Sequence, residues 1–420
     1  MKKILLFELC LLFLATNFQS DNPPGWYQQT LPVNDLVNDI FFIDTLTGWV
    51  VTRGHTNNQD TGYIMKTTNG GDNWTIQYIR NINFTTVQFV DNMTGYVGGA
   101  SGSGTIFVLK TTNGGDNWIE IMGTTAGTQV DDLYFINALT GWICDSPNLI
   151  GLGLLKTTNG GLNWVQQLDN SYHPFRVHFI NSDTGWITNT DLQGKLYKTT
   201  NGGNNWSLQY TYNNGVVDIY FLNGLIGIAT SGNMRRTTDG GFTWQNSPTN
   251  AGGPSISFGS DSIGWAGSDL NRIAKSTDGG IHWGYQTSPQ FNNLSTFAFD
   301  SLIAWAGGSS VVHTTDGGGP VMSIQLISNE VPSDFQLYQN YPNPFNPGTI
   351  IKFKVKSLKN VKLSVFDITG KELAVLVNEK LSPGVYEYTF EAGNLPSGVY
   401  FYSLFADGDR MDTKKMVLLK

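Results

Sequence analysis

Apolar and polar residues alternate in short runs along most of this chain. On one face of the predicted strands stand Val87 and Phe89, followed by Asp91, and Ile106 and Val108, followed by Lys110. Alternation with a period of two is typical of β-strands whose two faces meet different surroundings. The runs end at Gly, Asn and Asp, which favour tight turns. The pattern predicts an all-β protein.

One turn phrase recurs seven times and sets the spacing of the predicted strands. It first reads Thr67-Thr68-Asn69-Gly70-Gly71-Asp72-Asn73-Trp74. The other copies begin at Thr111, Thr157, Thr199, Thr237, Ser276 and Thr314. The first glycines of successive copies lie 44, 46, 42, 38, 39 and 38 residues apart. A period near 40 residues with strands on both sides is typical of a propeller blade, so we predict a seven-bladed β-propeller.

A second phrase precedes each turn and completes the blade. Its clearest copies run over residues 42–49, 89–96, 135–142 and 179–186, from a Phe to a Gly-Trp or Gly-Tyr pair. Each blade then contains a strand, a tight turn, a second strand, a variable loop, a third strand, the Gly-Gly turn and a fourth strand opening on Trp. Glycine supplies backbone conformations closed to other residues. We expect the Trp to fill the space between neighbouring blades.

The seventh turn ends in Gly319-Pro320 and lacks its Trp. Residues 25–29, Gly-Trp-Tyr-Gln-Gln, resemble residues 163–167, the start of the outer strand in another blade. We therefore predict that residues 25–30 supply the outer strand of the last blade, so that the two ends of the propeller are joined.

The ends of the chain have a different character from the repeats. Residues 1–20 have the basic start, short apolar stretch and polar exit of a secretory signal peptide. No later apolar run is long enough to cross a bilayer, so we expect no transmembrane segment in the mature chain. The predicted organisation is signal peptide 1–20, propeller 21–320, linker 321–334 and a second domain 335–420.

The second domain again shows strand alternation and turn signals, which predict a small Ig-like β-sandwich of six or seven strands. Its phrases lie at residues 335–347, 361–367, 395–402 and 414–420. They resemble the C-terminal sorting domain (type A) of type IX secretion cargo. The resemblance implies a bacterium of the Bacteroidota or their relatives. It also implies that residues 335–420 bind the type IX machinery, and that the protein is secreted or held at the outer cell surface.

The turn phrase resembles the Asp-box, or BNR repeat, of sialidases, sortilin-type receptors and several glycoside hydrolases. Residues 237–244 fit Ser/Thr-X-Asp-X-Gly-X-Thr-Trp at every position. In those families the box joins the third and fourth strands, away from the ligand face, so we interpret the boxes as scaffold. Single seven-bladed propellers with such boxes also resemble the photosystem II assembly and stability factor family, which binds protein without catalysis.

Charge narrows the classes of partner. Residues 21–320 contain 12 Lys and Arg against 22 Asp and Glu, and residues 321–420 contain 11 against 10. An acidic propeller argues against a nucleic-acid partner. The sequence has no metal-ligand cluster and no phosphate-binding loop, so we expect no metal and no cofactor.

A Lys, Arg or His residue precedes each of the seven boxes. The seven positions are Lys66, Lys110, Lys156, Lys198, Arg236, Lys275 and His313. They form either a ring of cations for an anionic partner or a repeated structural position at a strand end.

We expect a ligand over blades one to four, where the loops opposite the boxes are long. These loops span residues 53–62, 77–86, 98–105, 121–132, 144–153, 168–177, 188–195 and 209–217. The predicted ligand-binding side chains are Arg53, His55, Arg80, Asp132, Tyr172, His173, Arg176, Asp191 and Tyr212. The alternative is that each is a solvated loop residue.

The sequence leaves three alternative functions open. The first is a non-enzymatic propeller that binds a protein or a glycan. The second is a divergent glycoside hydrolase, sialidase-like or xyloglucanase-like, which needs two carboxyls facing a cleft. Asp131 and Asp145 are its candidate pair, because the one glutamate of the propeller, Glu120, is predicted on an outer strand. The third is a purely structural role in a surface layer.

Overall fold

The computed structural model describes residues 25–419 apart from 55–60, 126, 128, 146–150, 190–193, 231–232, 248–251, 269–271, 290–292, 320, 322–323, 329 and 393–394. The predicted signal peptide, residues 1–20, lies outside the described residues. Within the described part, regular structure is β-strand except for the short 3-10 turn η1 (Asn170–Tyr172). That part of the chain has no helix with the length and apolarity needed to cross a membrane.

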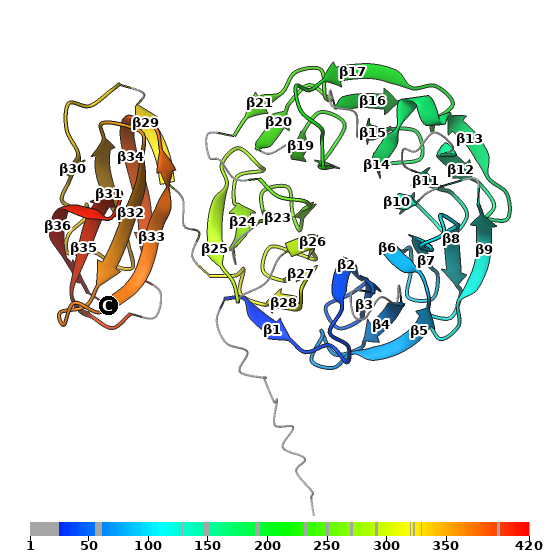
Figure 1. Cartoon of the computed structure of the whole chain (residues 1–420), viewed down its shortest axis with the longest axis horizontal. Helices are drawn as coiled ribbons and strands as arrows, with labels where there is room; N and C mark the ends of the chain where they lie inside the picture. The colour runs from blue at the N-terminus through cyan, green and yellow to red at the C-terminus, as the bar shows by residue number, and fades with distance from the viewer. Residues whose placement is uncertain are drawn as a thin grey trace, which may run out of the picture.

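Seven four-stranded antiparallel sheets form a ring, as Figure 1 shows, which confirms the predicted propeller. Blade one runs from the centre outward through β2 (Leu36–Phe42), β3 (Gly48–Arg53), β4 (Gly62–Thr67) and β5 (Thr75–Arg80). The next five blades repeat this order: β6 (Asn83–Phe89), β7 (Gly95–Ala100), β8 (Ile106–Thr111) and β9 (Ile119–Thr124); β10 (Val130–Phe135), β11 (Gly141–Asp145), β12 (Gly153–Thr157) and β13 (Val165–Leu168); β14 (Pro174–Phe179), β15 (Gly185–Asn189), β16 (Lys195–Thr199) and β17 (Ser207–Thr211); β18 (Asp218–Phe221), β19 (Gly227–Thr230), β20 (Met234–Thr237) and β21 (Gln245–Asn246); β22 (Ile256–Phe258), β23 (Gly264–Gly267), β24 (Arg272–Ser276) and β25 (Gly284–Thr287).

The last blade contains strands from both ends of the propeller. Its inner strands are β26 (Asn293–Ala298), β27 (Ala304–Gly308) and β28 (Val311–Thr314), and its outer strand is β1 (Tyr27–Gln29). The N-terminal strand pairs antiparallel with β28, with Tyr27 opposite His313. Trp26 is 6% exposed and donates from Nε1 to Oε1 of Gln286 at 3.0 Å. The prediction that residues 25–30 close the ring is confirmed.

Aromatic rings fill the gaps between blades. Trp49 on β3 stacks on Phe89 of the next blade, with ring centroids 3.5 Å apart, and the box Trp118 meets the same Phe edge-on at 5.9 Å. The stacked pair recurs at Tyr96–Phe135, Trp142–Phe179, Trp186–Phe221 and Trp305–Phe42. The box Trp therefore belongs to each inter-blade cluster, as predicted, while the direct stack across the gap is made by the second-strand Trp or Tyr.

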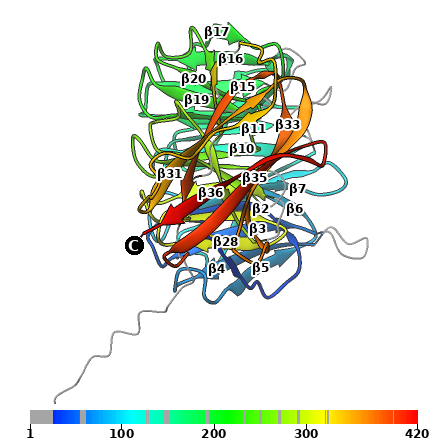
Figure 2. The ribbon, with the colours of Figure 1, turned by 90° about the vertical axis from the view of Figure 1, so that its left-hand side faces the viewer.

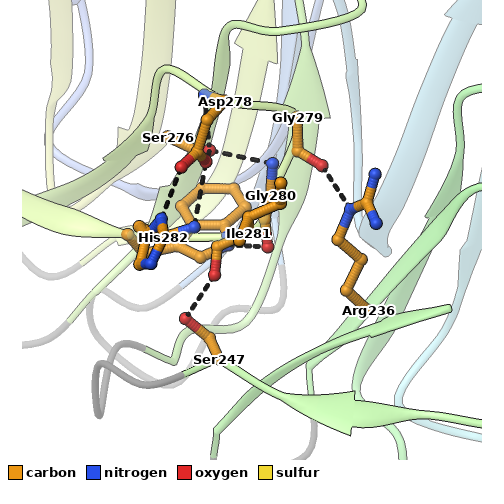
Figure 3. A network of polar contacts seen from close by, with 9 residues as sticks. Arg236, Ser247, Ser276, Asp278, Gly279, Gly280, Ile281 and His282 are labelled. Carbon is orange, nitrogen blue, oxygen red and sulfur yellow. Dashed lines mark hydrogen bonds and ion pairs between the residues drawn. The ribbon is translucent and has the colours of Figure 1, made fainter.

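The boxes are turns closed by their own side chains. In the sixth copy, shown in Figure 3, the amide of Gly280 donates to Oγ of Ser276 at 2.8 Å, and the amide of His282 donates to Oδ1 of Asp278 at 2.9 Å. The imidazole of His282 also contacts Oδ2 of Asp278 at 2.6 Å. Each box lies between the third and fourth strands of its blade, as expected from the family resemblance.

The basic residues before the boxes tie neighbouring blades together. Nζ of Lys66 lies over the Trp49 ring and donates to the carbonyl of Gly114 in the next box at 2.8 Å. The equivalent bonds are Lys110 to Gly160, Lys156 to Gly202, Arg236 to Gly279 and Lys275 to Gly317. Lys198 donates instead to the carbonyl of Gly224, in the turn between the first two strands of the next blade. Their charges face protein carbonyls, which supports the structural interpretation of this ring.

After the propeller, two four-stranded sheets pack around one core to form a sandwich. One contains β29 (Ile324–Ser328), β34 (Gly384–Glu391), β31 (Gly348–Val355) and β30 (Gln336–Leu337), and the other contains β33 (Glu372–Leu381), β32 (Lys359–Phe366), β35 (Gly398–Ala406) and β36 (Asp409–Leu418). Figure 2 shows β31, β33, β35 and β36 from the side of the sandwich.

The segment 321–334, predicted as a linker, contains the strand β29, which pairs with β34 through Ile324 opposite Tyr388. The linker prediction was wrong for these residues. The strand is five residues long and is followed by polar residues and a Pro, so its alternation is too short to stand out in the sequence.

Candidate functional site

The first strands of the blades surround a channel through the propeller. A cavity of about 320 Å³ is lined by residues from all seven of them: β2, β6, β10, β14, β18, β22 and β26, with a few flanking residues. A second cavity of about 260 Å³ shares several of these residues and adds Arg53, Asn83, Gln129 and Phe175. We refer to this second cavity as the channel mouth.

The mouth opens on the face opposite the boxes. In blades one to six the first strand starts near the mouth and ends at a Phe beside the turn to the second strand, as β2 does at Phe42. That turn bonds to the box of its own blade, for example through the amide of Gly70 and the carbonyl of Leu46 at 2.8 Å. The scaffold turns and the mouth therefore occupy opposite faces, as predicted for the ligand face.

Three aspartates face the channel at one level, and we call Asp39, Asp132 and Asp218 the carboxylate layer. They lie on β2, β10 and β18, three residues before the Phe that ends each strand, in blades one, three and five. The other four blades have Thr86, Arg176, Ser255 and Ser295 at this position.

Each carboxylate of the layer bridges two blades. Oδ2 accepts a hydrogen bond from a backbone amide of the next blade: Val87 to Asp39 at 2.8 Å, Val177 to Asp132 at 2.9 Å and Ile256 to Asp218 at 2.7 Å. Oδ1 accepts from the amide of the following residue in its own strand. The three side chains are therefore held rigidly.

A β-bulge precedes this level in several blades. The pairing register shifts between Val37 and Asp39, between Val130 and Asp132, and between Pro174 and Arg176. A bulge adds one residue and turns the following side chain away from regular alternation. The bulges therefore position the side chains of this level in blades one, three and four.

Among the described residues that line the larger cavity, Arg176 is the one Lys or Arg. Its Nη1 donates to the carbonyl of Asp131 at 2.8 Å, and Nε lies 3.7 Å from Oδ1 of Asp218. Burial acts to lower the pKa of Arg176, but the surrounding carboxylates, Asp132 foremost, raise it above its ordinary value. The guanidinium is therefore charged.

One guanidinium does not balance the carboxylate layer. Burial raises the pKa of Asp132 to about 7, although Arg176 and a backbone hydrogen bond act in the opposite direction. Burial likewise raises the pKa of Asp218 to about 6 and shifts the pKa of Asp39 upward. The channel has too little positive charge to keep all three side chains ionised below neutral pH.

An aromatic belt lies two residues deeper in the channel. It comprises Phe41, Tyr134, His178, Tyr220 and Phe297, each one residue before the end of its strand. Adjacent rings are close: the centroids of Phe41 and Phe297 are 5.0 Å apart, and those of His178 and Tyr220 are 4.9 Å apart. Burial lowers the pKa of His178 to about 4, so its imidazole is neutral at physiological pH.

Some predicted site residues meet in this channel. Asp132 and Arg176 lie at the carboxylate level, and Arg53 and Asp131 line the mouth. The sequence-based prediction missed Asp39 and Asp218. Both occupy the same position before the strand-ending Phe as Asp132, so aligning the seven first strands would have found them.

Other predicted residues lie elsewhere. Tyr212 was predicted at the ligand face, but it is 1% exposed and packs against Trp244 and Tyr210 in a blade core. The sequence of residues 209–217 read as a polar loop, whereas Tyr212 turns inward after β17. Arg80 is on the outer strand β5 and pairs with Glu120 of the next outer strand at 2.8 Å.

Four further predicted site residues remain, of which two can be placed in the structure. Tyr172, at the end of η1, packs edge-on against Tyr197 with centroids 5.3 Å apart. His173 follows with a left-handed backbone, φ 46°. His55 and Asp191 lie outside the described residues.

One carboxyl of the pair predicted for a hydrolase, Asp145, is not open to a substrate. Asp145 is fully buried, and its oxygens accept hydrogen bonds from the amides of Gln129 and Leu152. Asp131 accepts from Nε2 of Gln129 at 2.9 Å. In this arrangement the carboxylate of Asp145 fastens two loops and does not face a cleft.

Comparison with known families confirms the two predicted resemblances. Residues 339–419 match the secretion system C-terminal sorting domain. Residues 79–243 match the photosynthesis system II assembly factor YCF48. No match was found among curated proteins.

Solved structures of similar shape are propellers. The structure of YCF48 bound to D1 peptide is 17% identical, with a TM-score of 0.56, over 70% of this chain and 98% of that one. YCF48 from Cyanidioschyzon merolae is 18% identical, with a TM-score of 0.55, over the same shares. The WD40 β-propeller domain of Doa1 is 13% identical, with a TM-score of 0.53, over 69% and 96%. At these identities the likeness shows the fold.

Proposed function

We propose that this chain is an exported binding protein whose propeller holds a partner protein at the channel mouth. The proposal rests on the positions at which the amino-acid sequences of the blades differ from one another. Positions that build the blades repeat, whereas the level of the carboxylate layer reads Asp, Thr, Asp, Arg, Asp, Ser, Ser around the ring. Differences between repeats that gather around one cavity favour a site over a scaffold.

The mouth is suited to a segment of extended peptide. Asn83 and Gln129 offer amide groups that can bond a peptide backbone, and Phe175 lies beneath the guanidinium of Arg176 at 4.3 Å. Aromatic and Arg side chains are enriched where proteins bind one another. A propeller of this fold, YCF48, has been solved with D1 peptide bound, which favours a peptide over a glycan here.

Export follows from the second domain. The match of residues 339–419 to the sorting domain supports type IX secretion to the cell surface or the surroundings. We infer that this domain binds the secretion machinery and that residues 1–20 direct the first membrane crossing.

Peptide selection on the purified protein tests the binding function. We expect a displayed random-peptide library to yield binders whose affinity falls at least 10-fold in Phe175→Ala, since a mouth contact is lost. Phe242→Ala is the matched control, because Phe242 is 59% exposed on the box face. Failure to select any binder, or equal loss in both variants, would contradict the proposal.

A further inference from the structure

The channel below the mouth combines two features that suit one kind of group. The carboxylate layer presents three acidic side chains, and the aromatic belt places aromatic side chains in the lining two residues deeper. Two residues of strand span about 7 Å, so a small group between the levels would reach both. We propose that the channel takes a cationic side chain, the ammonium of a Lys or the guanidinium of an Arg, from the partner bound at the mouth. The inference rests on the proposed function and names the chemistry that it recognises.

The charge of the layer supports a cation. Asp39, Asp132 and Asp218 face one guanidinium, and that guanidinium is already engaged on one side by the carbonyl of Asp131. Both oxygens of each layer carboxylate accept backbone hydrogen bonds, which hold the charges in place but do not neutralise them. A second cation would lower the excess of negative charge from two units to one, inside a cavity where charges interact more strongly than in water.

The aromatic belt supports an organic cation over a metal ion. An ammonium or guanidinium within about 6 Å of a ring face gains a cation–π interaction. The rings of Phe41, Tyr134 and Tyr220 are each partly exposed to the channel. The apolar stem of a Lys or Arg side chain can also lie along such a surface while its head reaches the carboxylates.

The titration of the layer gives the inference a pH signature. The pKa of Asp132 is about 7 and that of Asp218 about 6, both raised by burial, and a bound cation would lower them. Binding would then release protons near neutral pH and weaken in acid. The titratable or charged groups facing the layer are Arg176, Asp131, His178, Tyr134 and Tyr220; Ser295, a neutral neighbour, donates to Asp39.

Small amines test the inference without a known partner. The probes are n-pentylammonium, n-pentylguanidinium, the neutral pentan-1-ol and the anionic pentanoate, each titrated into the full protein and followed by NMR. At pH 8 we expect both cations to bind at least 10-fold more tightly than pentanol. At pH 5 this ratio should fall towards one, because the layer becomes protonated.

Variants separate recognition from folding damage. Asp218→Asn should reduce the preference for cations, but it also alters a bond between blades. Arg176→Met is the sharper variant, and it is read at pH 9 because loss of the guanidinium raises the pKa of Asp132 and Asp218 further. Removing the competing cation should then strengthen amine binding, a gain that misfolding cannot produce. Asp116→Asn, exposed in a box, is the control and should change nothing. Equal binding of pentanol and the cations, or weaker amine binding in Arg176→Met, would overturn the inference.

The outcome also separates this inference from the proposed function. Selected peptides that bind at the mouth with no preference for Lys or Arg would refute the cation site and leave peptide binding intact. Amines that bind in the channel while no peptide binds at the mouth would refute peptide binding and leave the cation site intact.

Discussion

At the scale of single residues, six of the seven blades place a glycine at the start of the second strand directly against the phenylalanine that ends the first strand. A Cβ added to Gly95 would lie 2.5 Å from the ring of Phe89, and the same short distance recurs at Gly48, Gly185 and Gly227. Blade seven is the exception that supports this reason for the glycine. There Ala298 takes the place of the Phe, and Ala304 takes the place of the Gly. The small first-strand residue removes the need for a glycine opposite it.

Gly95→Ala should therefore overpack blade two. We expect a loss of about 1–3 kcal/mol in the free energy of unfolding, because the Phe89 ring must move against Trp49. Chemical denaturation of the variant and the wild type measures this loss in the free energy of unfolding. Ala304→Gly is the control in blade seven and should cost less than about 1 kcal/mol, the backbone entropy of a glycine. Equal losses in the two variants would contradict this account of the glycines.

Asp132 should make stability depend on pH. Burial raises the pKa of Asp132 to about 7 in the folded state, whereas an unfolded Asp titrates near 3.9. The folded state then holds the extra proton below pH 7, so this contribution to stability is lost as the pH rises through 7. Between pH 6 and 8 the wild type should lose about 1 kcal/mol through this group.

A matched variant shows how much of the change in stability with pH comes from Asp132. Asp132→Asn cannot titrate, so its stability should change less than that of the wild type between pH 6 and 8. The pKa values of His178 and His313, lowered by burial to about 4 and about 3, act with the opposite sign, mainly below pH 6.5. Identical pH slopes in the two proteins would show that Asp132 does not carry the effect.

At the scale of strands and turns, ring closure depends on one short segment. Trp26 occupies the cluster with Trp265 and Ala298, where the other blades place their own box Trp. Deleting residues 21–30 should lower the melting temperature sharply, and Trp26→Ala alone should cost about 3–5 kcal/mol. Deleting residues 21–24, which leaves Trp26 and the strand β1 in place, is the control. An unchanged melting temperature in the longer deletion would refute the closure.

Much of this level could be predicted from the sequence. The spacing of the glycines predicted seven blades, because each blade contains one copy of the box. The seventh copy lacks its Trp, and this departure from the repeat pointed to Trp26. The carboxylate layer was harder, since bulges before Asp39 and Asp132 change which way a side chain points. Tyr212 and β29 were misassigned because inward turns after short strands leave no periodic signal.

At the scale of the whole molecule, the sandwich and the propeller have separate tasks. The core of the sandwich is a cluster of its own, and the matched sorting domain covers residues 339–419. Deleting residues 339–420 should leave the protein inside the outer membrane of a host with type IX secretion, as judged by fractionation. Export unchanged by that deletion would contradict the assigned role of this domain.

The central claim is that partners bind at the channel mouth and not at the boxes. The most direct measurement places a photo-crosslinking phenylalanine analogue at position 175 or at position 242 on secreting cells. Both positions hold a Phe, one at the mouth and one exposed on the box face. We predict a protein adduct from position 175, suppressed by a peptide selected on the purified protein, and none from position 242. Adducts from position 242 alone, or equal adducts from both, would contradict the account.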